Sequence, residues 1–289
     1  ALAANTTASF NTAVGLNSGN TLTTGADNTL IGVSAGTSLT TGTLNVAVGR
    51  NALAGGAATN RNVAIGNNTL QSVSAASSVD SYNVAIGYSA GAAVSTGTQN
   101  TLIGGLAGDA ITTASNNIAI GYNAGTAITT GAENVAIGTN ALLANTTGAS
   151  NVAVGIYALN ANTTAANNVA VGKNALTANT TGSGNVAFGS EALSTNVAGS
   201  NSTAIGRDAL KTQNPDSATD TDNTAVGYRA GLSVTTGVKN TLIGSLAGDA
   251  TTTASNNTAV GFESLTTNTT GGQNTAFGTL TLKANTTGA

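Results

Sequence analysis

Short stretches of alternating apolar and polar residues recur at an even spacing along the whole chain. The pattern Asn-x-Ala/Leu-Val/Ile/Phe-Gly occurs sixteen times, once with Ser202 in place of Asn, and its glycines recur every seventeen positions except for two longer gaps. A typical copy at 168–184 reads NVAVGKNALTANTTGSG. Its first five residues alternate and are β-prone, which predicts a short strand closed by glycine. The later TTG predicts a second short extended piece that ends in a turn.

Seventeen residues are too few for a strand–helix–strand unit, but they suit one turn of a solenoid whose strands stack in parallel on neighbouring coils. We therefore predict an all-β parallel β-solenoid of sixteen 17-residue coils. Residues 1–10 belong to a partial preceding coil, residues 11–289 form a single repeat domain, and the coils at 62–82 and 202–222 are four residues longer. Two sets of residues exemplify the structural motif: Asn62, Ile65 and Gly66, and Asn168, Val171 and Gly172.

Positions within a coil are numbered from the opening Asn, which is position 0. Fifteen of the nineteen charged residues fall at positions 5, 6, 9 or 16, and the other four lie in the two longer coils. These positions are predicted to be turns that face water. Seven coils have Gly at position 8, and six of these have an aliphatic residue at position 11, whereas the other coils have Leu at position 8. This exchange predicts one apolar slot per coil, because a core tolerates neither a void nor an overfill.

The predicted strand has two uncharged faces. Position 1 is Val, Ile or Thr and position 3 is Val, Ile or Phe, while position 2 on the opposite face is Ala or Leu. A strand with one wet face would place long polar residues there, so both faces are predicted to be covered, by lateral association of several chains into a symmetric bundle. The alternative is a thin solenoid of a single chain with a wall of Ala side chains. One face lines the core of the solenoid, and small Ala side chains on the other would let a second chain approach closely. The opening Asn predicts either an amide ladder along the stack or a local turn residue.

Composition narrows the range of functions. The chain is 7% charged and 3% aromatic, has a net charge of −3, and contains no Cys, His, Met or Trp. Nothing forms a basic stripe or a long apolar run, so neither nucleic-acid binding nor membrane insertion is expected. Without His or Cys, the usual nucleophilic triads and zinc sites cannot form, and we expect no enzyme, no cofactor and no metal. The nearby charges of Arg207, Asp208 and Lys211 are explained better by an exposed surface than by a polysaccharide-cleaving site.

Two recurrent Thr and Asn patterns have simple structural interpretations. Asn-Thr-Thr triplets, such as those at Asn145 and Asn179, match the glycosylation sequon but recur because the coil recurs. Threonine pairs at positions 12 and 13 suggest ice binding as an alternative function. Adjacent residues of a strand point to opposite sides, however, so only one Thr per coil is expected to face outward.

The longer coils and the exposed aromatic residues are the candidates for specific contacts. The inserts lie at 71–82 and 211–222, which are 140 residues apart. The segment at 100–117 is duplicated at 240–257, again 140 residues further on. Loops on a rigid scaffold often carry binding, although a tolerated insertion would look the same. The aromatic residues could instead pack against an adjacent chain. The candidate surface contacts are Asp80, Tyr82, Tyr88, Tyr122, Tyr157, Lys211, Pro215, Asp216, Tyr228 and Phe262.

The motif also resembles known surface proteins. NVAIG at 62–66, 83–87 and 134–138 is similar to the head repeats of trimeric autotransporter adhesins, and NTAVG at 11–15 and 223–227 is similar to repeats of phage and prophage tail fibres. The resemblance implies a left-handed β-roll, a homotrimer around one axis, and display outside the cell on a bacterial surface or a virion. It implies attachment to a surface, a cell or matrix. The coils here are longer than the usual head coil, with TTG as an added corner.

The sequence therefore predicts a structural or adhesive segment of an extracellular fibre that mediates attachment to a surface or host. Two alternatives are a phage tail fibre with a receptor-binding shaft and an ice-binding β-solenoid.

Overall fold

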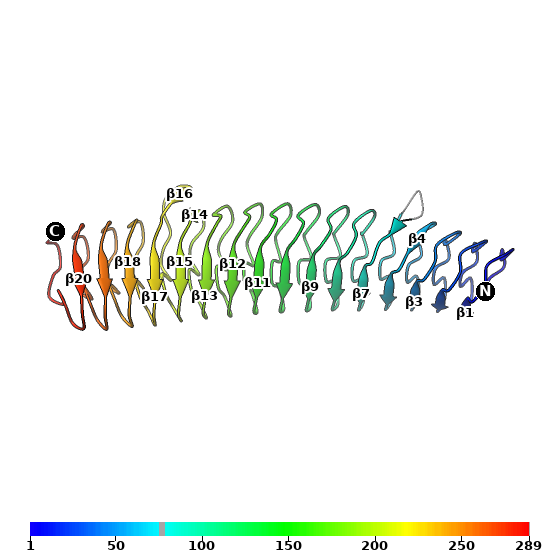
Figure 1. Ribbon diagram of the computed structural model, residues 1–289, viewed down its shortest axis with the longest axis horizontal. Coiled ribbons are helices and arrows are strands. Elements are labelled where there is room, and N and C mark those ends of the chain that lie inside the picture. Colours follow the sequence, from blue (N-terminus) through cyan, green and yellow to red (C-terminus); the bar gives the residue numbers. More distant parts are fainter. Residues whose placement is uncertain (75–78, 289) are drawn as a thin grey trace. The chain divides into compact units, whose positions relative to one another are not determined.

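The computed structural model describes residues 1–74 and 79–288, and these residues contain strands and turns but no helix. The fold is a parallel β-solenoid of 17-residue coils, as the repeat predicts (Figure 1). The chain divides into two compact units, Ala1–Thr147 and Gly148–Ala289.

Every regular coil contributes one three-residue strand to a parallel sheet. In the first unit the strands follow one another in the order β1 (Thr12–Val14), β2 (Thr29–Ile31), β3 (Val46–Val48), β5 (Val63–Ile65), β7 (Val84–Ile86), β8 (Thr101–Ile103), β9 (Ile118–Ile120) and β10 (Val135–Ile137). In the second unit the order is β11 (Val152–Val154), β12 (Val169–Val171), β13 (Val186–Phe188), β15 (Thr203–Ile205), β17 (Thr224–Val226), β18 (Thr241–Ile243), β19 (Thr258–Val260) and β20 (Thr275–Phe277). Equivalent positions pair throughout, as Ala170 does with Ala187.

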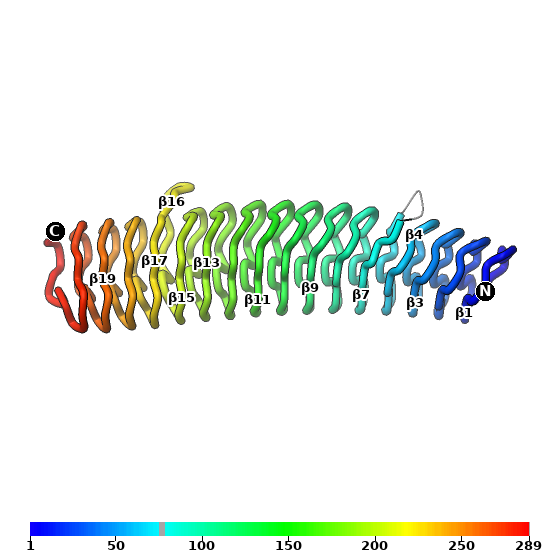
Figure 2. The backbone as a smooth tube through the Cα atoms, viewed as in Figure 1, coloured from blue at the N-terminus to red at the C-terminus, as the bar shows by residue number. Residues whose placement is uncertain are grey.

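The two longer coils each add a short strand that pairs with the preceding coil. In the first unit β4 (Thr59–Asn60) pairs with β6 (Val79–Asp80), and in the second unit β14 (Gly199–Ser200) pairs with β16 (Thr219–Asp220). Figure 2 shows the backbone near β16 standing out beyond the adjacent turns of its unit. The main sheet stays in register across both longer coils. Of the first insert, 71–82, residues 75–78 lie outside the described residues.

The core of each unit is a narrow stack of small and medium side chains. Position 2 is fully buried in every coil after the first. The predicted apolar slot is confirmed: a Cβ added to Gly36 would lie 2.8 Å from Leu39 at position 11, and one added to Gly108 would lie 2.8 Å from Ile111. Leu30, the position 2 residue of the Gly36 coil, also reaches into this space. Each slot is therefore filled from position 8 or from position 11, and a Leu at position 2 adds to the filling where it occurs.

An amide ladder runs along the opening position of the coils, as one of the two sequence interpretations predicted. Asn45 Nδ2 donates to Asn28 Oδ1 at 3.0 Å, and Asn168 Nδ2 donates to Asn151 Oδ1 at 3.3 Å. The same Oδ1 atoms accept the backbone N–H of the next Asn, both at 3.0 Å. Because these residues are fully buried, the ladder satisfies polar groups that would otherwise be costly inside the coil.

The glycine that closes each strand is required by close backbone contact. Gly66 has φ +132°, and a Cβ there would lie 2.4 Å from the carbonyl oxygen of Gly87. Gly172 has φ +131°, and its Cβ would lie 2.6 Å from the carbonyl carbon of Gly189. Any other residue would be strained by its φ angle and would meet the next coil.

The sequence-based assignment of the two strand faces was wrong. The Ala face does not await a partner: Ala64, Ala170 and Ala187 are fully buried inside their own coil. The branched face points outward, and Ile65 and Phe188 are exposed there. The physical reason is the volume of the interior. The narrow interior already holds a second column of buried residues at position 7, mostly Ala, and the side chain that fills the apolar slot. In most coils this leaves room only for a small side chain at position 2.

Candidate functional site

The outer face of the parallel sheet is the main candidate for function in each unit. It consists of two adjacent columns, with Val, Ile or Thr at position 1 and Val, Ile or Phe at position 3. The side chains at position 3 are half-buried or exposed, and Phe188 and Phe277 are 55% and 80% exposed. Neither column contains a charged residue in either unit. This surface, positions 1 and 3 of every coil, is called the outer aliphatic face below.

The chemistry of the outer aliphatic face is that of a packing surface. Parallel sheets are usually covered on both sides, and their strands then read as continuous apolar residues. Exposed apolar patches that extend over several strands commonly mark an interface. Such a face can associate with a similar face, and its only polar side-chain groups are the threonine hydroxyls at position 1.

The threonine columns at positions 12 and 13 differ from each other, as the alternation predicted. The hydroxyl at position 12 is used within the fold, since Thr23 Oγ1 donates to the Thr40 carbonyl at 3.1 Å and Thr252 Oγ1 donates to the Thr269 carbonyl at 3.0 Å. The residue at position 13 is exposed in the regular coils except at Ala58, which is buried, and Ala198, which is half-buried. Only one threonine per coil therefore faces outward on this side.

The Asn-Thr-Thr triplets are confirmed as repeat corners. Asn145 and Asn179 are both fully buried. Asn179 Nδ2 donates to the Gly182 carbonyl at 2.9 Å and to Asn162 Oδ1 at 3.1 Å, so it belongs to a second amide ladder. A buried, hydrogen-bonded amide is not accessible for glycosylation in the folded chain.

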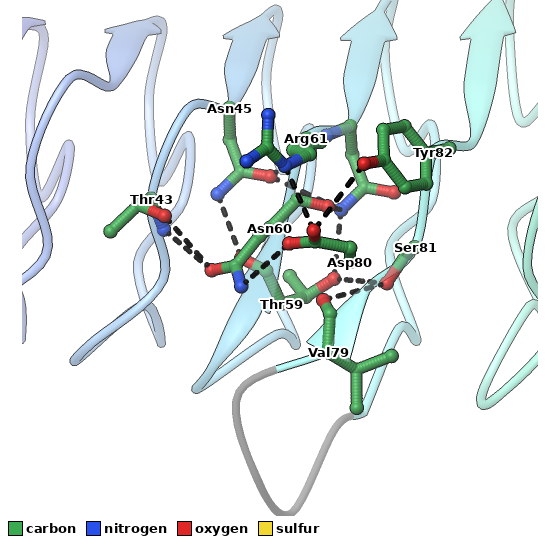
Figure 3. Close-up of polar contacts among 10 residues, drawn as sticks. Thr43, Asn45, Thr59, Asn60, Arg61, Val79, Asp80, Ser81 and Tyr82 are labelled. Atoms are coloured by element: carbon green, nitrogen blue, oxygen red, sulfur yellow. Dashed lines mark hydrogen bonds and ion pairs between the residues drawn. The ribbon is translucent and has the colours of Figure 1, made fainter.

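Two of the candidate contact residues, Asp80 and Tyr82, belong to a polar cluster on the first longer coil (Figure 3). Arg61 Nε lies 3.0 Å from Asp80 Oδ2, and Asn60 Nδ2 donates to Asp80 Oδ1 at 3.2 Å. Tyr82 Oη also donates to Asp80 Oδ2, at 3.3 Å. The carboxylate is thus engaged by three donors, and two of them, on Asn60 and Arg61, tie Asp80 to the preceding coil. Tyr82 keeps about half of its side chain exposed.

The second longer coil presents its candidate residues differently. Pro215 is buried, and its ring atoms lie 3.1 and 3.2 Å from the place where a Cβ of Gly199 would be. Contrary to the sequence-based expectation, Pro215 is therefore no exposed contact residue: it packs against Gly199 of the preceding coil, which leaves space for the ring. Asp216 next to it is exposed. Lys211 forms ion pairs with Glu191 and Asp208. The hydrogen bond to Glu191, helped by Asp208 and opposed by burial, raises the pKa of Lys211 above its usual value.

The five candidate aromatic residues in the turn after the strand are all exposed. Their exposed fractions lie between 40% and 59%. Tyr228 differs from the others because Arg207 Nη2 donates to its Oη at 2.8 Å and the Arg207 guanidinium lies 4.7 Å from its ring centre. The full set is Tyr88, Tyr122, Tyr157, Tyr228 and Phe262.

Sequence reasoning missed a buried polar network behind the second longer coil. Gln213 Nε2 lies within hydrogen-bonding distance of three oxygens, Ser202 Oγ, Asn196 Oδ1 and Thr221 Oγ1, at 3.1 to 3.3 Å, and its two N–H groups are shared among them. Its Oε1 accepts from Asn223 Nδ2 at 2.9 Å. Two signals in the sequence could have indicated this network. Ser202 is the one opening residue that is not Asn, and its coil carries a long amide side chain at position 11.

Residues 1–74 and 79–288 contain no group of three or more His, Cys, Asp or Glu side chains placed to hold a metal ion. Within the same ranges, no helix is long and apolar enough to span a membrane. No family model matches the chain, and no curated protein sequence matches it.

Proposed function

We propose that this chain is a structural and adhesive segment of an extracellular fibre, in which copies of the chain associate through the outer aliphatic face to form a homotrimer. The observation that carries the proposal is the exposure of two uncharged columns on a parallel sheet in both units. A parallel sheet with one aliphatic face open to water is incomplete by the usual rules of sheet packing.

The burial available on the outer aliphatic face is of the size that association requires. Completing the burial of one half-exposed Val or Ile side chain contributes on the order of 1 kcal/mol. Position 3 offers eight side chains in each unit, a gross contribution on the order of 8 kcal/mol per unit, which is comparable to the cost of association. Extended copies in register would repeat any surface group many times, so weak contacts to a cell, matrix or other surface would add up by avidity.

The resemblance of NVAIG at 83–87 and 134–138 to adhesin head repeats supports a trimer and a location on a bacterial surface or a virion. A phage tail fibre with a receptor-binding shaft would use the same stacked coils and the same outer face. The receptor would in either case be bound by groups outside the aliphatic columns.

The proposal is tested by light scattering coupled to size exclusion. We expect a mass near three times the 27.6 kDa of one chain. The variants Ile103→Asp and Val226→Asp place a charge on the outer aliphatic face of each unit, and together they should produce a single chain. Matched controls are Thr113→Asp and Thr236→Asp, which place the same charge at exposed position 13 and should leave the mass unchanged. A single chain for the unmodified protein would contradict the assembly.

Adhesion is tested separately on beads that carry either the unmodified chain or the double outer-face variant. After washing over matrix and over cell layers, more beads with the unmodified chain should remain attached. Equal retention of the two kinds of bead would show that assembly does not support adhesion.

Ice binding stays a second candidate because of one observation in the second unit. Position 1 is Thr in five successive coils and position 3 beside it is aliphatic or Phe, which forms a regular two-column array. If the outer aliphatic face remains open on a single chain, this array would face water, and thermal hysteresis of the protein solution would test it. The five residues are Thr203, Thr224, Thr241, Thr258 and Thr275.

A further inference from the structure

Aromatic rings and guanidinium groups gather on one turn surface of the second unit, away from the strand positions of the outer aliphatic face. Tyr228 lies in the turn after β17, and the guanidinium groups of Arg207 and Arg229 lie 4.7 and 5.9 Å from its ring centre. Phe262 occupies the same position two coils further on, with Ser245 between them. Stacked parallel strands are about 4.8 Å apart, so the backbones of Tyr228 and Phe262 are about 9.6 Å apart.

Arg229 has no acidic partner, although its side chain is half-buried. Among residues 1–74 and 79–288, the ion pairs involve Arg61, Arg207, Lys211 and Lys283 but not Arg229. Its guanidinium therefore retains its hydrogen-bond donors for a ligand beside the Tyr228 ring. Arg207 is held in place by Tyr228 Oη and by Asp208, at 3.5 Å from its Nε, and 63% of its side chain is exposed.

The first unit contains the same aromatic pair without the arginines. Tyr88 and Tyr122 are the counterparts of Tyr228 and Phe262 in the duplicated part of the chain, and Gly105 stands between them. The Tyr122 ring lies over Gly105, since a Cβ there would be 3.5 Å from the ring. Asn67 and Ser89 occupy the positions of Arg207 and Arg229. These two pairs account for four of only nine Phe and Tyr residues in the chain, all exposed, so they do not serve the core.

We propose that the surface formed by Arg207, Tyr228, Arg229, Ser245 and Phe262 binds an acidic saccharide. A sugar ring has a face of C–H groups that can lie on an aromatic ring, while its hydroxyl groups remain in water at the edges. A carboxylate or sulfate on that sugar is the group that a guanidinium fork recognises best, through two parallel hydrogen bonds. Two exposed rings, one small residue between them and one unpaired arginine supply each of these contacts.

The charge distribution favours a saccharide over a nucleic acid. The second unit has six basic and seven acidic residues, so it lacks the net positive charge that a phosphate backbone requires. Only two of the basic residues lie beside the rings. An acidic saccharide would be the ligand class for the proposed adhesive function. The inference rests on that function only in this respect.

Isothermal titration with tetragalacturonic acid tests the site, with maltotetraose as a neutral saccharide of equal length. At low salt we expect the acidic tetrasaccharide to bind at least ten times more tightly, and the affinity to fall as salt is added. Arg207→Asn with Arg229→Ser installs the residues of the first unit and should weaken binding at least tenfold. Phe262→Ser should do the same without changing a charge. Tyr88→Ser in the first unit is the matched control and should change the affinity less than twofold.

Several outcomes would overturn the proposal. They are failure of tetragalacturonic acid to bind at millimolar concentration, unchanged affinity in the double arginine variant or in Phe262→Ser, and equally tight binding of a thymidine tetranucleotide. Thermal unfolding of each variant checks that the coils are intact. Light scattering on the same samples separates this inference from the proposed assembly. Failure to bind the saccharide at the mass of a trimer would contradict the saccharide site alone. A mass other than that of a trimer, with saccharide binding retained, would contradict the proposed trimer alone.

Discussion

Ser202 and Gln213 together take the place of the Asn side chain that opens each of the remaining coils. Gln213 Nε2 donates to Ser202 Oγ at 3.1 Å, and both side chains are fully buried. At the corresponding positions of the first longer coil stand Asn62 and Val73. The first longer coil has its amide at position 0 and an aliphatic residue at position 11, whereas the second has a hydroxyl at position 0 and an amide at position 11.

This exchange predicts that the two positions are coupled. Gln213→Val alone leaves Asn223 Nδ2 and Ser202 Oγ without their Gln213 partner, and we expect a loss of about 2–4 kcal/mol in the free energy of unfolding. Adding Ser202→Asn restores the pair found in the first longer coil and should recover at least half of that loss. Urea unfolding followed by circular dichroism measures the cycle. Strictly additive effects of the two substitutions would contradict the coupling.

A buried hydroxyl in the apolar slot predicts a stabilising substitution. Thr251 is fully buried at position 11, and its Oγ1 has no hydrogen-bond partner among the described residues. The duplicated coil has Ile111 at this position. Thr251→Ile should therefore raise the free energy of unfolding by about 1–3 kcal/mol, because it removes an unsatisfied polar atom and adds apolar contact. The reverse change, Ile111→Thr, is the matched control and should lower stability by a similar amount. If Thr251→Ile destabilises the protein, the slot is too small for the longer side chain.

The two glycines Gly172 and Gly105 predict opposite responses to alanine. Gly172 has φ +131° and faces the backbone of Gly189, so Gly172→Ala should cost about 3 kcal/mol or more. Gly105 has no positive φ, and a Cβ there would meet only the Tyr122 ring at 3.5 Å or more. Gly105→Ala should change stability by less than about 1 kcal/mol. Thermal unfolding of both variants compares them, and a tolerated Gly172→Ala would show that neighbouring coils can move apart.

The repeat predicted much of this fold because each coil has nearly the same sequence and therefore nearly the same local structure. The strand at positions 1–3, the apolar slot and the amide ladder all follow from residue types that recur in every coil. The orientation of the strand could not be predicted from the repeat. Alternation separates the residues into two faces, but it does not show which face lies inside when neither face is charged. Here Ala170 lies inside and Val171 outside, so the available volume decides and polarity does not. The network around Gln213 was not predicted either, because it depends on the pairing of β16 with β14 of the preceding coil, which brings Thr221 beside Ser202.

The ion pairs of Lys211 predict a small alkaline dependence of stability. The pKa of Lys211 is raised above 10.5 in the folded chain, chiefly by its hydrogen bond to Glu191. A raised pKa stabilises the fold fully below the unfolded value, and this contribution is lost as the pH rises through the folded value. Because 36% of the Lys211 side chain is exposed, the contribution is below about 1 kcal/mol. The difference in unfolding free energy between the unmodified protein and Lys211→Met should be present at about pH 9 and vanish at higher pH. A constant difference would assign it to packing of the side chain.

The orientation of the strand predicts that neighbouring residues Ala170 and Val171 respond differently to substitution. Ala170 is fully buried, and its coil already fills the apolar slot with Leu176, so Ala170→Leu should overpack the interior and lower the unfolding free energy by about 2–4 kcal/mol. Val171 lies on the outer aliphatic face, so Val171→Thr should change the stability of a single chain by less than about 0.5 kcal/mol. Urea unfolding at a dilution where light scattering gives one chain for both variants isolates the interior from association. At higher concentration, Val171→Thr should then weaken assembly while Thr181→Ser, on the exposed threonine column, should not. If Ala170→Leu were tolerated and Val171→Thr disrupted the single chain, the strand would face the other way and the outer aliphatic face would have to be reassigned.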